Sequence, residues 1–535
     1  MRGLLRLVAL LIYVGAGYLI GSLVGRLVLI PVAAVAHVSH GLQTGLSVAA
    51  GLLGIFSAVG YWRAKFGEFQ IGGGVHGSAH FASAAQVKSS LGGGSGLIIG
   101  RENRKGGQLL RYAGEAHLLT IAPTRSGKGV GAIIPNLLTA DRSVFCIDPK
   151  GENARITARA RGRFGPVYVL DPFEISGQPS AAFNPLAGLD PDSLDLAEDA
   201  ALLADALVHD PPGQGGEAHW NEEAKALIAG VILYVVCEER PEARTLATVR
   251  ELLTLSPGDF AATLAIMQES ASAGGLVRRA ANRHLGKSER EAAGVLSSAQ
   301  RHTHFLDSVR INGTMARSDF RFADLKQTKA TVFLVLPPER LDAYSRWLRL
   351  MVAQAIHDLA RSPARSPASG PAAPVLFLLD EFAALGRLEP VERAFGLMAG
   401  YGLQLWPILQ DMHQLWGAYG KKAGTFVSNA GIVQIFNVAD VETASWVSKS
   451  IGATTMSYQT TGTSTSRGGM QLFETKSTST TAHLSRRELM TPDEIMRLDS
   501  SLEILLRQGE APVIAAKVRY YDGPEFRGLF GKAIV

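Results

Sequence analysis

The amino-acid sequence predicts an α/β fold, in which helices cover both faces of a mostly parallel sheet and a further group of helices is inserted. The first of two observations is a set of short apolar runs that end in Gly, Pro or Asp and alternate with helical stretches. Runs without polar alternation are typical of strands buried on both faces, as in parallel sheets. They lie at residues 118–124, 144–148, 167–171, 331–337, 375–381, 403–410 and 432–438.

The second observation is the long interval between the third and fourth runs, which holds no strand pattern. Segments 219–239, 245–255 and 292–300 instead show helical spacing. We therefore expect a helical insertion, including an all-α domain, at 190–315. A chain of 535 residues is long enough for several folding units. The sheet domain would be formed by two parts of the chain, 66–189 and 316–535.

Residues 1–65 predict a membrane anchor of two helices. Leu4 to Gly25 is a run of 22 residues interrupted by one arginine, and Leu42 to Tyr61 is an uncharged run of 20. Either run can span the ~30 Å hydrocarbon core as a helix. Two alternatives stay open: a cleaved signal peptide, since Ala34-Val35-Ala36 resembles a processing site, and a buried hairpin for the Gly-rich second run.

The charges around these runs predict their orientation. Arg2 and Arg6 lie at the start of the first run, whereas Arg63 and Lys65 follow the second. By the positive-inside rule, the N-terminus and everything after Lys65 would be cytoplasmic. Together with Arg26, these residues account for the whole net charge of +5, because the remainder holds 48 basic and 48 acidic residues. Any DNA-binding surface must therefore be a local patch.

The only two cysteines, Cys146 and Cys237, lie in apolar runs and show no metal-ligand spacing. They are expected to be small core residues, and so few cysteines suit a reducing compartment.

The segment TIAPTRSGKGVGAIIPNLL (120–138) has the pattern of a phosphate-binding loop between a strand and a helix. In such loops, backbone N–H groups and the helix N-terminus surround phosphates, and a lysine reaches the terminal ones. Lys128 is that lysine, and Gly127 permits close approach of the backbone. The expected nucleotide-binding residues are Pro123, Thr124, Arg125, Ser126, Gly127, Lys128, Gly129 and Val130.

Two positions of the loop depart from the strict G-x-x-x-x-G-K-S/T pattern. Ala122 replaces the first glycine, and Gly129 stands where a hydroxyl would bind Mg²⁺. The hydroxyl of Thr124 or Ser126 could partly replace it. A turn without nucleotide remains the alternative, but the strand–loop–helix context favours nucleotide binding.

Acidic residues end the apolar run VLFLLDE, as expected of a strand that serves a nucleotide site. Asp380 would hold Mg²⁺, through water, and Glu381 would orient or deprotonate the attacking water. Gln410 closes the next strand and could sense the γ-phosphate, or simply face solvent. With Lys128, these residues predict a RecA-like P-loop ATPase that uses ATP and Mg²⁺.

Other polar residues also follow predicted strands. Asp148, Lys150 and Glu152 could line the nucleotide site or a subunit boundary, and Asp171 and Asn184 repeat the pattern.

The chain also resembles a family, the TraG-type coupling proteins of bacterial type IV secretion and conjugation systems. The matching stretches run in family order over nearly the whole chain. They are HGSAHFA (76–82), APTRSGKGVGAIIPNLL (122–138), FCIDPKGEN (145–153), FNPL (183–186), HWNEEAKALI (219–228), LFLLDEFAALGRL (376–388), ILQDMHQLWGAYG (408–420) and RRELMTPDEIMRL (486–498).

The resemblance implies a homo-hexameric ring at the bacterial inner membrane. Such a ring would receive DNA with an attached relaxase and pass it to the channel subunits of a type IV secretion system. The resemblance also implies that the helical insertion is the family's cargo-contacting all-α domain, and that Gly129 is a shared departure. A neighbouring subunit would supply an arginine to the transition state, for which Arg486, Arg487 and Arg497 are candidates.

Basic clusters are the candidates for contact with DNA. Arg278, Arg279, Arg283 and Lys287 fall within about three helical turns and could follow phosphates by charge alone, or form a solvated surface. Residues 101–105 are a second basic patch with the same two interpretations. Residues 361–374 are a Pro/Ser/Ala linker, and Thr454–Thr481, crowded with Ser and Thr, predicts a mobile loop or irregular hairpin.

Three functions remain in competition. The leading one is an ATP-driven motor that moves DNA toward a membrane channel. The second is a receptor whose nucleotide site gates the docking of protein effectors without processive translocation. The third is a chromosome-segregation translocase, which the absence of a recognisable DNA-orienting domain after the motor disfavours.

Overall fold

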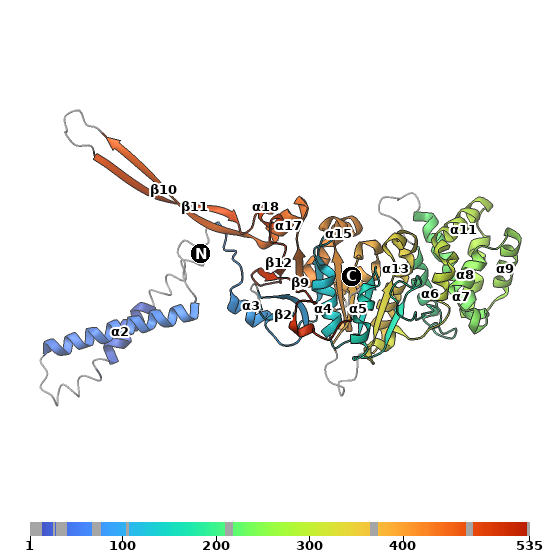
Figure 1. Cartoon of the computed structure of the whole chain (residues 1–535), viewed down its shortest axis with the longest axis horizontal. Helices are drawn as coiled ribbons and strands as arrows, with labels where there is room; N and C mark the ends of the chain where they lie inside the picture. Colours follow the sequence, from blue (N-terminus) through green and yellow to red (C-terminus); the bar gives the residue numbers. More distant parts are fainter. Residues whose placement is uncertain are drawn as a thin grey trace. The chain divides into compact units, whose positions relative to one another are not determined.

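The computed structural model describes residues 13–24, 27, 40–66, 76–102, 106–208, 218–363, 373–397, 399–466 and 475–531. The chain divides into two compact units (Figure 1). The larger unit comprises residues 79–452 and 488–535, and the smaller one comprises residues 1–78 and 453–487.

An eleven-stranded sheet forms the centre of the larger unit, with the strand order β2-β1-β13-β12-β9-β3-β8-β7-β4-β6-β5. All seven predicted strands are present. They are β3 (His117–Ile121), β4 (Val144–Asp148), β5 (Val167–Leu170), β6 (Thr331–Val335), β7 (Val375–Leu379), β8 (Leu403–Leu409) and β9 (Ala430–Phe436). These strands pair in parallel, which confirms the predicted sheet.

Four more strands extend the sheet beyond β9 in antiparallel fashion. They are β1 (Leu97–Arg101), β2 (Leu109–Tyr112), β12 (Leu502–Leu506) and β13 (Val513–Ala516). The sequence did not predict β1, β2 and β12 because a charged residue interrupts or ends the apolar run of each, and β13 has only four residues, two of which are alanine. Strands from the start of the larger unit (β1 and β2) and from its end (β12 and β13) thus pair with one another on the same side of β9.

Helices cover both faces of the sheet, and alternate strand residues point to opposite cores. On one face, Leu118 and Cys146 pack with residues of α4 (Ile134–Thr139) and α5 (Glu152–Arg161). On the other face, Leu119 and Ile147 join a core built from the remaining helices. Those helices include α13 (Leu341–Arg361), α14 (Glu389–Leu397), α15 (Met412–Tyr419), α16 (Ala423–Asn429), α17 (Val441–Ile451) and α18 (Pro492–Met496). A short helix, α3 (Ala84–Leu91), contributes to the first core.

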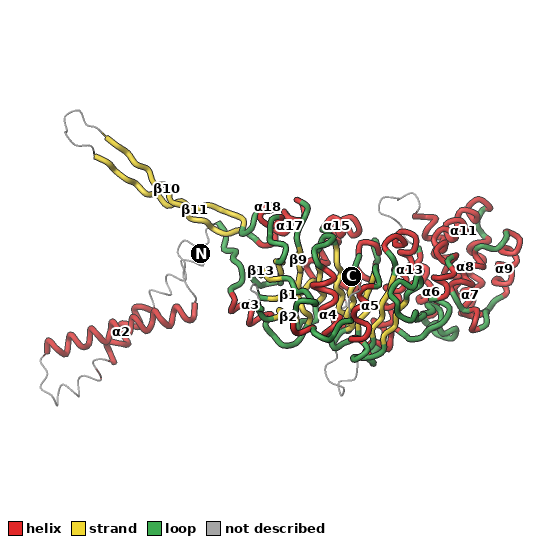
Figure 2. The backbone as a smooth tube through the Cα atoms, in the orientation of Figure 1, coloured by secondary structure: helices red, strands yellow, loops and turns green. Residues whose placement is uncertain are grey.

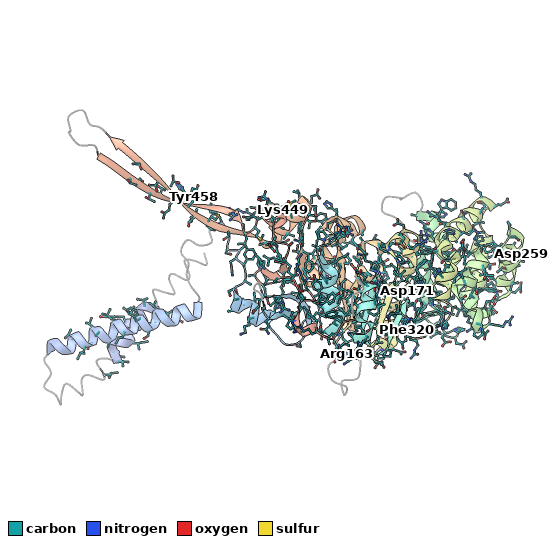
Figure 3. The ribbon with its side chains drawn as sticks, in the orientation of Figure 1. Arg163, Asp171, Asp259, Phe320, Lys449 and Tyr458 are labelled. Carbon is teal, nitrogen blue, oxygen red and sulfur yellow. The ribbon has the colours of Figure 1, made fainter. Side chains whose placement is uncertain are left out.

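The predicted helical insertion is present at one end of the sheet (Figure 2). Its helices are α6 (Leu196–Leu207), α7 (Ala218–Glu238), α8 (Leu246–Leu253), α9 (Pro257–Glu269), α10 (Ser272–Leu285), α11 (Glu289–Thr303) and α12 (Val309–Gly313). Thr245, Ser256 and Ser288 cap the starts of α8, α9 and α11 with their hydroxyls. Asp259, on α9, lies at the end of this group remote from the sheet (Figure 3).

The HWNEEAKALI stretch begins α7, the central helix of the insertion, and holds it to α11. Asn221 is fully buried, and its Oδ1 accepts a hydrogen bond from Ser298 (3.0 Å). His302 Nε2 lies 2.8 Å from the same oxygen. The Trp220 ring rests on Gly294, where a Cβ atom would lie 2.6 Å from it. These residues therefore stabilise the helical packing.

The smaller unit contains α2 (His40–Phe66), a helix over residues 13–24, and two long strands. Across the described residues, no helix combines the length and the apolar character that a membrane crossing requires. β10 (Ala453–Ser466) and β11 (Thr475–Glu488) form a two-stranded sheet where a mobile loop or irregular hairpin was predicted. The β-branched threonines of this region favour extended backbone, which the expectation of a loop underestimated.

Candidate nucleotide-binding site

The phosphate-binding loop connects β3 to a π-helical turn, η1 (Gly129–Ile133), that continues as α4. The loop starts with a tight turn in which Ser126 N donates to Pro123 O (3.1 Å). Arg125 (φ 64°) and Gly127 (φ 95°) adopt left-handed backbone conformations. A glycine is favoured at position 127 for this reason. The first amides of the following helix have no acceptor within it and are available to an anion.

The sheet topology brings three sequence segments to this loop. β3 lies between β9 and β8, and β7 lies beyond β8. Because these strands are parallel, the residues that follow each of them lie at one edge of the sheet. Ala122 N donates to Leu409 O (2.7 Å), which joins the start of the loop to the end of β8. Asp380, Glu381 and Gln410 therefore reach the same edge as Lys128.

Lys128 is held by two carboxylates. Its Nζ lies 2.9 Å from Asp380 Oδ1 and 2.8 Å from Glu381 Oε1. Burial alone would lower the pKa of Lys128, but Asp380 and Glu381 outweigh it, so the pKa is raised. Burial raises the pKa of Asp380 against the opposing effect of Lys128. The lysine stays charged at neutral pH and balances an otherwise costly buried carboxylate.

Glu381 has a strained backbone, with φ 49°. Its N–H donates to Asp380 Oδ1 (3.0 Å), and this conformation turns its side chain toward Lys128. A non-glycine residue in this region of φ costs free energy, and such strain is concentrated at functional sites.

Gln410 completes the cluster. Its Nε2 donates to Glu381 Oε2 (3.2 Å), and its Oε1 accepts from Thr124 Oγ1 (3.4 Å). The structure thus brings Lys128, Asp380, Glu381 and Gln410, the four predicted catalytic residues, into one chain of contacts.

The donor set fits a magnesium–nucleotide pair. Ser126 Oγ is buried and has no hydrogen-bond partner among the described residues. The described part of the chain contains no group of three His, Cys, Asp or Glu that could hold a metal by itself. A Mg²⁺ ion at Asp380 would therefore take most of its oxygen ligands from phosphates and water, as is usual for Mg²⁺.

Asp148 has a structural role next to this site. It is buried, and its Oδ2 accepts from Ala154 N (2.8 Å) at the start of α5. Burial raises the pKa of Asp148 to about 6, although backbone N–H donors oppose this effect. Lys150 and Glu152 are exposed on the loop and helix that follow.

Asp171 and Asn184 also serve the fold rather than the cluster around Lys128. Asp171 lies beyond β5 (Figure 3), and its Oδ2 accepts from Ser176 N (2.7 Å). Asn184 Nδ2 donates to Arg244 O (2.8 Å), which ties the segment after β5 to the helical insertion.

The predicted basic face of the insertion is divided by the structure. α10 ends at Leu285, so Lys287 lies beyond it. Arg283 binds Glu223 through two hydrogen bonds (2.7 and 3.0 Å), and Lys287 Nζ lies 2.8 Å from the same carboxylate. Hydrogen bonds from Arg283 are the main reason that the pKa of Glu223 falls to about 2. Lys287 Nζ also lies 3.1 Å from Glu291 Oε1, so Glu223 and Glu291 together neutralise these two cations.

The other two cations of this face contact backbone. Arg278 donates to Gln268 O (2.8 Å) and Arg279 to Gly274 O (3.2 Å). The prediction of one continuous basic surface of four residues is therefore corrected: within the described part of the chain, only Arg278 and Arg279 of the four lack a carboxylate partner.

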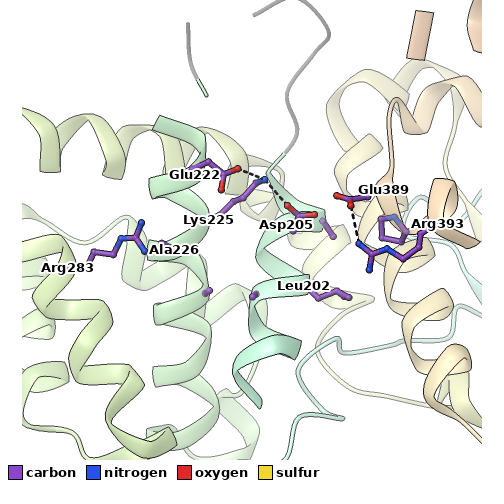
Figure 4. Close-up of a pocket in the computed structure, with 12 residues that line it drawn as sticks. Leu202, Asp205, Glu222, Lys225, Ala226, Arg283, Glu389 and Arg393 are labelled. Carbon is purple, nitrogen blue, oxygen red and sulfur yellow. Dashed lines mark hydrogen bonds and ion pairs between the residues drawn. The ribbon is translucent and has the colours of Figure 1, made fainter. Parts of the chain in front are cut away.

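A cavity of about 480 Å³ lies where α6 and α7 meet α14, away from Lys128. In Figure 4, Lys225 lies between Asp205 (2.7 Å) and Glu222 (2.9 Å), and Glu389 pairs with Arg393 (3.0 Å). The charged side chains that line this cavity largely pair with one another.

The three arginines proposed to act on a neighbouring subunit are exposed. Arg486 and Arg487 lie on β11 in the smaller unit, and Arg497 lies just beyond α18 with its nearest carboxylate, Asp493, at 3.8 Å. In the patch at 101–105, Arg101 pairs with Glu525, and residues 103–105 lie outside the described part.

Sequence reasoning missed Lys517, whose Nζ donates to Ser126 O in the phosphate-binding loop (2.9 Å). No motif marks this lysine, because it follows the short strand β13 near the end of the chain.

Comparison with known proteins places the chain in a family. The family model described as Type IV secretory system Conjugative DNA transfer matches residues 83–533. Protein VirD4 of Rhizobium rhizogenes is 31% identical over 440 residues, which cover 79% of this chain and 61% of VirD4. A conjugal transfer protein TraG of Escherichia coli is 30% identical over 462 residues, which cover 81% of this chain and 72% of TraG. The chain thus spans about three fifths of the length of its VirD4 relatives.

Solved structures share the fold. The bacterial conjugative coupling protein TrwBΔN70 aligns with a TM-score of 0.61 at 16% identity, over 82% of this chain and 92% of that one. TrwB with the ATP analogue ADPNP gives a TM-score of 0.61, and TrwB with ADP and Mg²⁺ gives 0.60. Both are 16% identical and cover 82% of this chain and 93% of TrwB.

Proposed function

The chain belongs to the Type IV secretory system conjugative DNA transfer family, and from this premise we propose that it is a coupling ATPase that drives DNA toward a secretion channel. The observation that carries the proposal is the contact chain from Thr124 through Gln410 and Glu381 to Lys128. It assembles, at one sheet edge, the groups that phosphoryl transfer to water requires.

Each of these residues would have its own role in ATP hydrolysis. Lys128 moves from the carboxylates to the terminal phosphates of ATP, for which its charge and position suit it. Glu381 then has an oxygen to accept a hydrogen bond from the attacking water, and Gln410 orients that carboxylate. Asp380 would hold Mg²⁺, which when bound would neutralise phosphate charge. The structures of TrwB with ADPNP and with ADP and Mg²⁺ support a nucleotide and magnesium here.

Placement in the bacterial inner membrane is also part of the proposal. In the smaller unit, small residues face each other between the two helices, since a Cβ on Gly17 would lie 2.6 Å from Gly54 O and one on Gly21 2.4 Å from Ala50 O. Large apolar side chains are exposed instead. They are Leu19, Ile20, Leu23, Val24, Leu46, Val48, Leu52, Leu53 and Phe56. Small residues inside and large apolar residues outside are typical of packed membrane helices, which supports a two-helix anchor at 1–65.

The partners follow from the family. DNA with an attached relaxase would be the cargo, type IV secretion channel subunits would receive it, and a homo-hexamer would be the working form. A ring would allow a neighbouring subunit to supply the arginine that the contacts around Lys128 do not include.

DNA-stimulated ATP turnover tests the proposal. The purified full-length chain should hydrolyse ATP faster when DNA is added, and Glu381→Gln should remove turnover while nucleotide binding persists. If DNA left turnover unchanged while a protein effector bound tightly, the nucleotide-gated effector receptor would replace the motor.

A further inference from the structure

The end of the larger unit's chain crosses the start of the phosphate-binding helix. We call residues 517–520 the C-terminal strap. Tyr520 N donates to Val130 O (3.3 Å) in the first turn of that helix. Gly131 faces the strap so closely that a Cβ there would lie 2.9 Å from Val518 O. The strap and the loop are therefore packed backbone to backbone.

Lys517 makes the first contact of the strap with the loop. Its Nζ donates to Ser126 O (2.9 Å) and to Asn437 Oδ1, and it lies 4.6 Å from the centre of the Phe436 ring. Burial lowers the pKa of Lys517 to about 8, with Glu503 and Asp499 opposing this effect and Arg519 adding to it. The side-chain amine of Lys517 is thus mostly protonated, and positively charged, at pH 7.

Asn437, the second acceptor, lies just beyond β9 in an unusual backbone conformation, with φ 30°. A non-glycine residue rarely adopts positive φ, and the strain persists only where surrounding contacts hold it. The bond from Lys517 is such a contact, and it fixes the ammonium between the ends of β9 and β13. Lys517 is therefore held in place independently of the loop.

The contact with Ser126 O has a consequence for the next peptide group. The carbonyl of Ser126 and the N–H of Gly127 belong to one planar trans peptide, so they point in opposite directions. A cation on the carbonyl side directs the N–H of Gly127 to the face of the loop opposite the strap. The same cation polarises the peptide group and makes that N–H a stronger donor to an anion.

We propose that Lys517 is a positioning residue of the nucleotide site, which holds the Ser126–Gly127 peptide so that the Gly127 N–H meets a phosphate oxygen of the nucleotide. Lys517 acts on the loop and does not contact the nucleotide itself. The inference rests on the proposed ATPase function and adds a second lysine, beyond Lys128, on which nucleotide binding depends.

The test compares Lys517→Met with Lys517→Arg and with a matched control, Arg519→Met. Arg519 belongs to the same strap, is exposed, and lies no closer than 4.0 Å to its nearest carboxylate, Asp522. In the full-length chain, Lys517→Met should weaken binding of a non-hydrolysable ATP analogue and raise KM for ATP, each about tenfold, as for the loss of a charge-assisted contact. The value of kcat should stay within about twofold, since a group that orients bound phosphate equally in ground and transition states acts on KM.

The conservative and control variants separate positioning from general stability. Lys517→Arg keeps the charge and should restore most of the affinity, and Arg519→Met should bind as the unaltered chain does. Unchanged affinity in Lys517→Met, or an equal loss in Arg519→Met, would overturn the inference. A lack of nucleotide binding by the unaltered chain would instead count against the proposed function.

Discussion

Gln410 Nε2 donates a hydrogen bond to Glu381 Oε2 across 3.2 Å, and this contact joins the end of β8 to the end of β7. Glu381 is thereby fixed from two sides, by Gln410 and by Lys128 at 2.8 Å. When a phosphate draws Lys128 away, Gln410 is the side chain that continues to hold the carboxylate.

Replacing Gln410 should therefore reduce the rate of the chemical step. We expect Gln410→Ala to lower kcat for ATP about tenfold with little change in nucleotide affinity, because Glu381 loses its orienting donor. Gln410→Glu should lower kcat further, since a second carboxylate would repel Glu381. Steady-state kinetics with a separate binding measurement check both variants, and wild-type kcat in both would contradict this role.

Lys128→Ala should abolish ATP turnover and substrate transfer while membrane insertion persists. The expected loss of turnover is at least about a hundredfold, as for removal of a preorganised charge at a reacting centre. Lys449→Ala, an exposed lysine on α17 (Figure 3), is the matched control. Normal transfer by Lys128→Ala would overturn the assignment of the loop.

Asp148 should make the fold less stable as pH rises. Its folded pKa of about 6 exceeds the usual 3.8, so its contribution to stability is complete below about pH 4 and is lost as pH rises through about 6. This difference of about two between the folded and the usual pKa corresponds to roughly 3 kcal/mol of folding free energy. The stability of Asp148→Asn relative to the unaltered chain should therefore increase between pH 4 and 6.5 in denaturant unfolding. Parallel pH profiles of the two proteins would show that Asp148 does not titrate in this way.

Glu223 controls two of the candidate DNA-contacting cations. Glu223→Ala would free Arg283, whereas Lys287 would keep its ion pair with Glu291 (3.1 Å). If this surface follows phosphates, DNA binding should tighten, and the slope of log K against log salt should steepen by about one unit, for one added phosphate contact. Glu269→Ala, an exposed acid on α9, removes the same charge elsewhere in the insertion. An unchanged slope in Glu223→Ala would place the DNA contact on another surface.

Deletion of residues 1–65 should yield a soluble, largely monomeric ATPase of low activity, if the anchor helps ring assembly. Size-exclusion chromatography with light scattering gives the mass, and turnover is measured on the same sample. Stable hexamers of the truncated chain would show that the anchor is dispensable for assembly.

The sequence predicted the parallel part of the sheet and the site because both depend on local patterns. A strand buried on both faces, such as β7, is a continuous apolar run, and the acidic pair at its end is visible in the same segment. By contrast, β12 contains Glu503, which is fully buried and accepts from Gln434 Nε2 (2.7 Å). A carboxylate in a strand is predicted to be exposed to solvent unless its hydrogen-bond partner, distant in the sequence, is known.

The helical insertion shows the same limit. Its helices were predictable from apolar spacing, but the pairing of Arg283 with Glu223 on another helix was not. For this reason the sequence alone predicts a basic, DNA-contacting surface from cations that merely share one segment of the chain. Lys517 and Ser126 are 391 positions apart in the chain, and only the folded sheet brings them together.

The position of the C-terminal strap also sets an order in time. A ribosome that has completed the phosphate-binding loop must add 391 residues after Ser126 before it reaches Lys517. Until then, the loop lacks Lys517 and the backbone contact at Val130. A nascent chain that has not yet reached the strap would thus lack these two contacts, and its phosphate-binding loop would bind nucleotide more weakly than the loop of the folded protein.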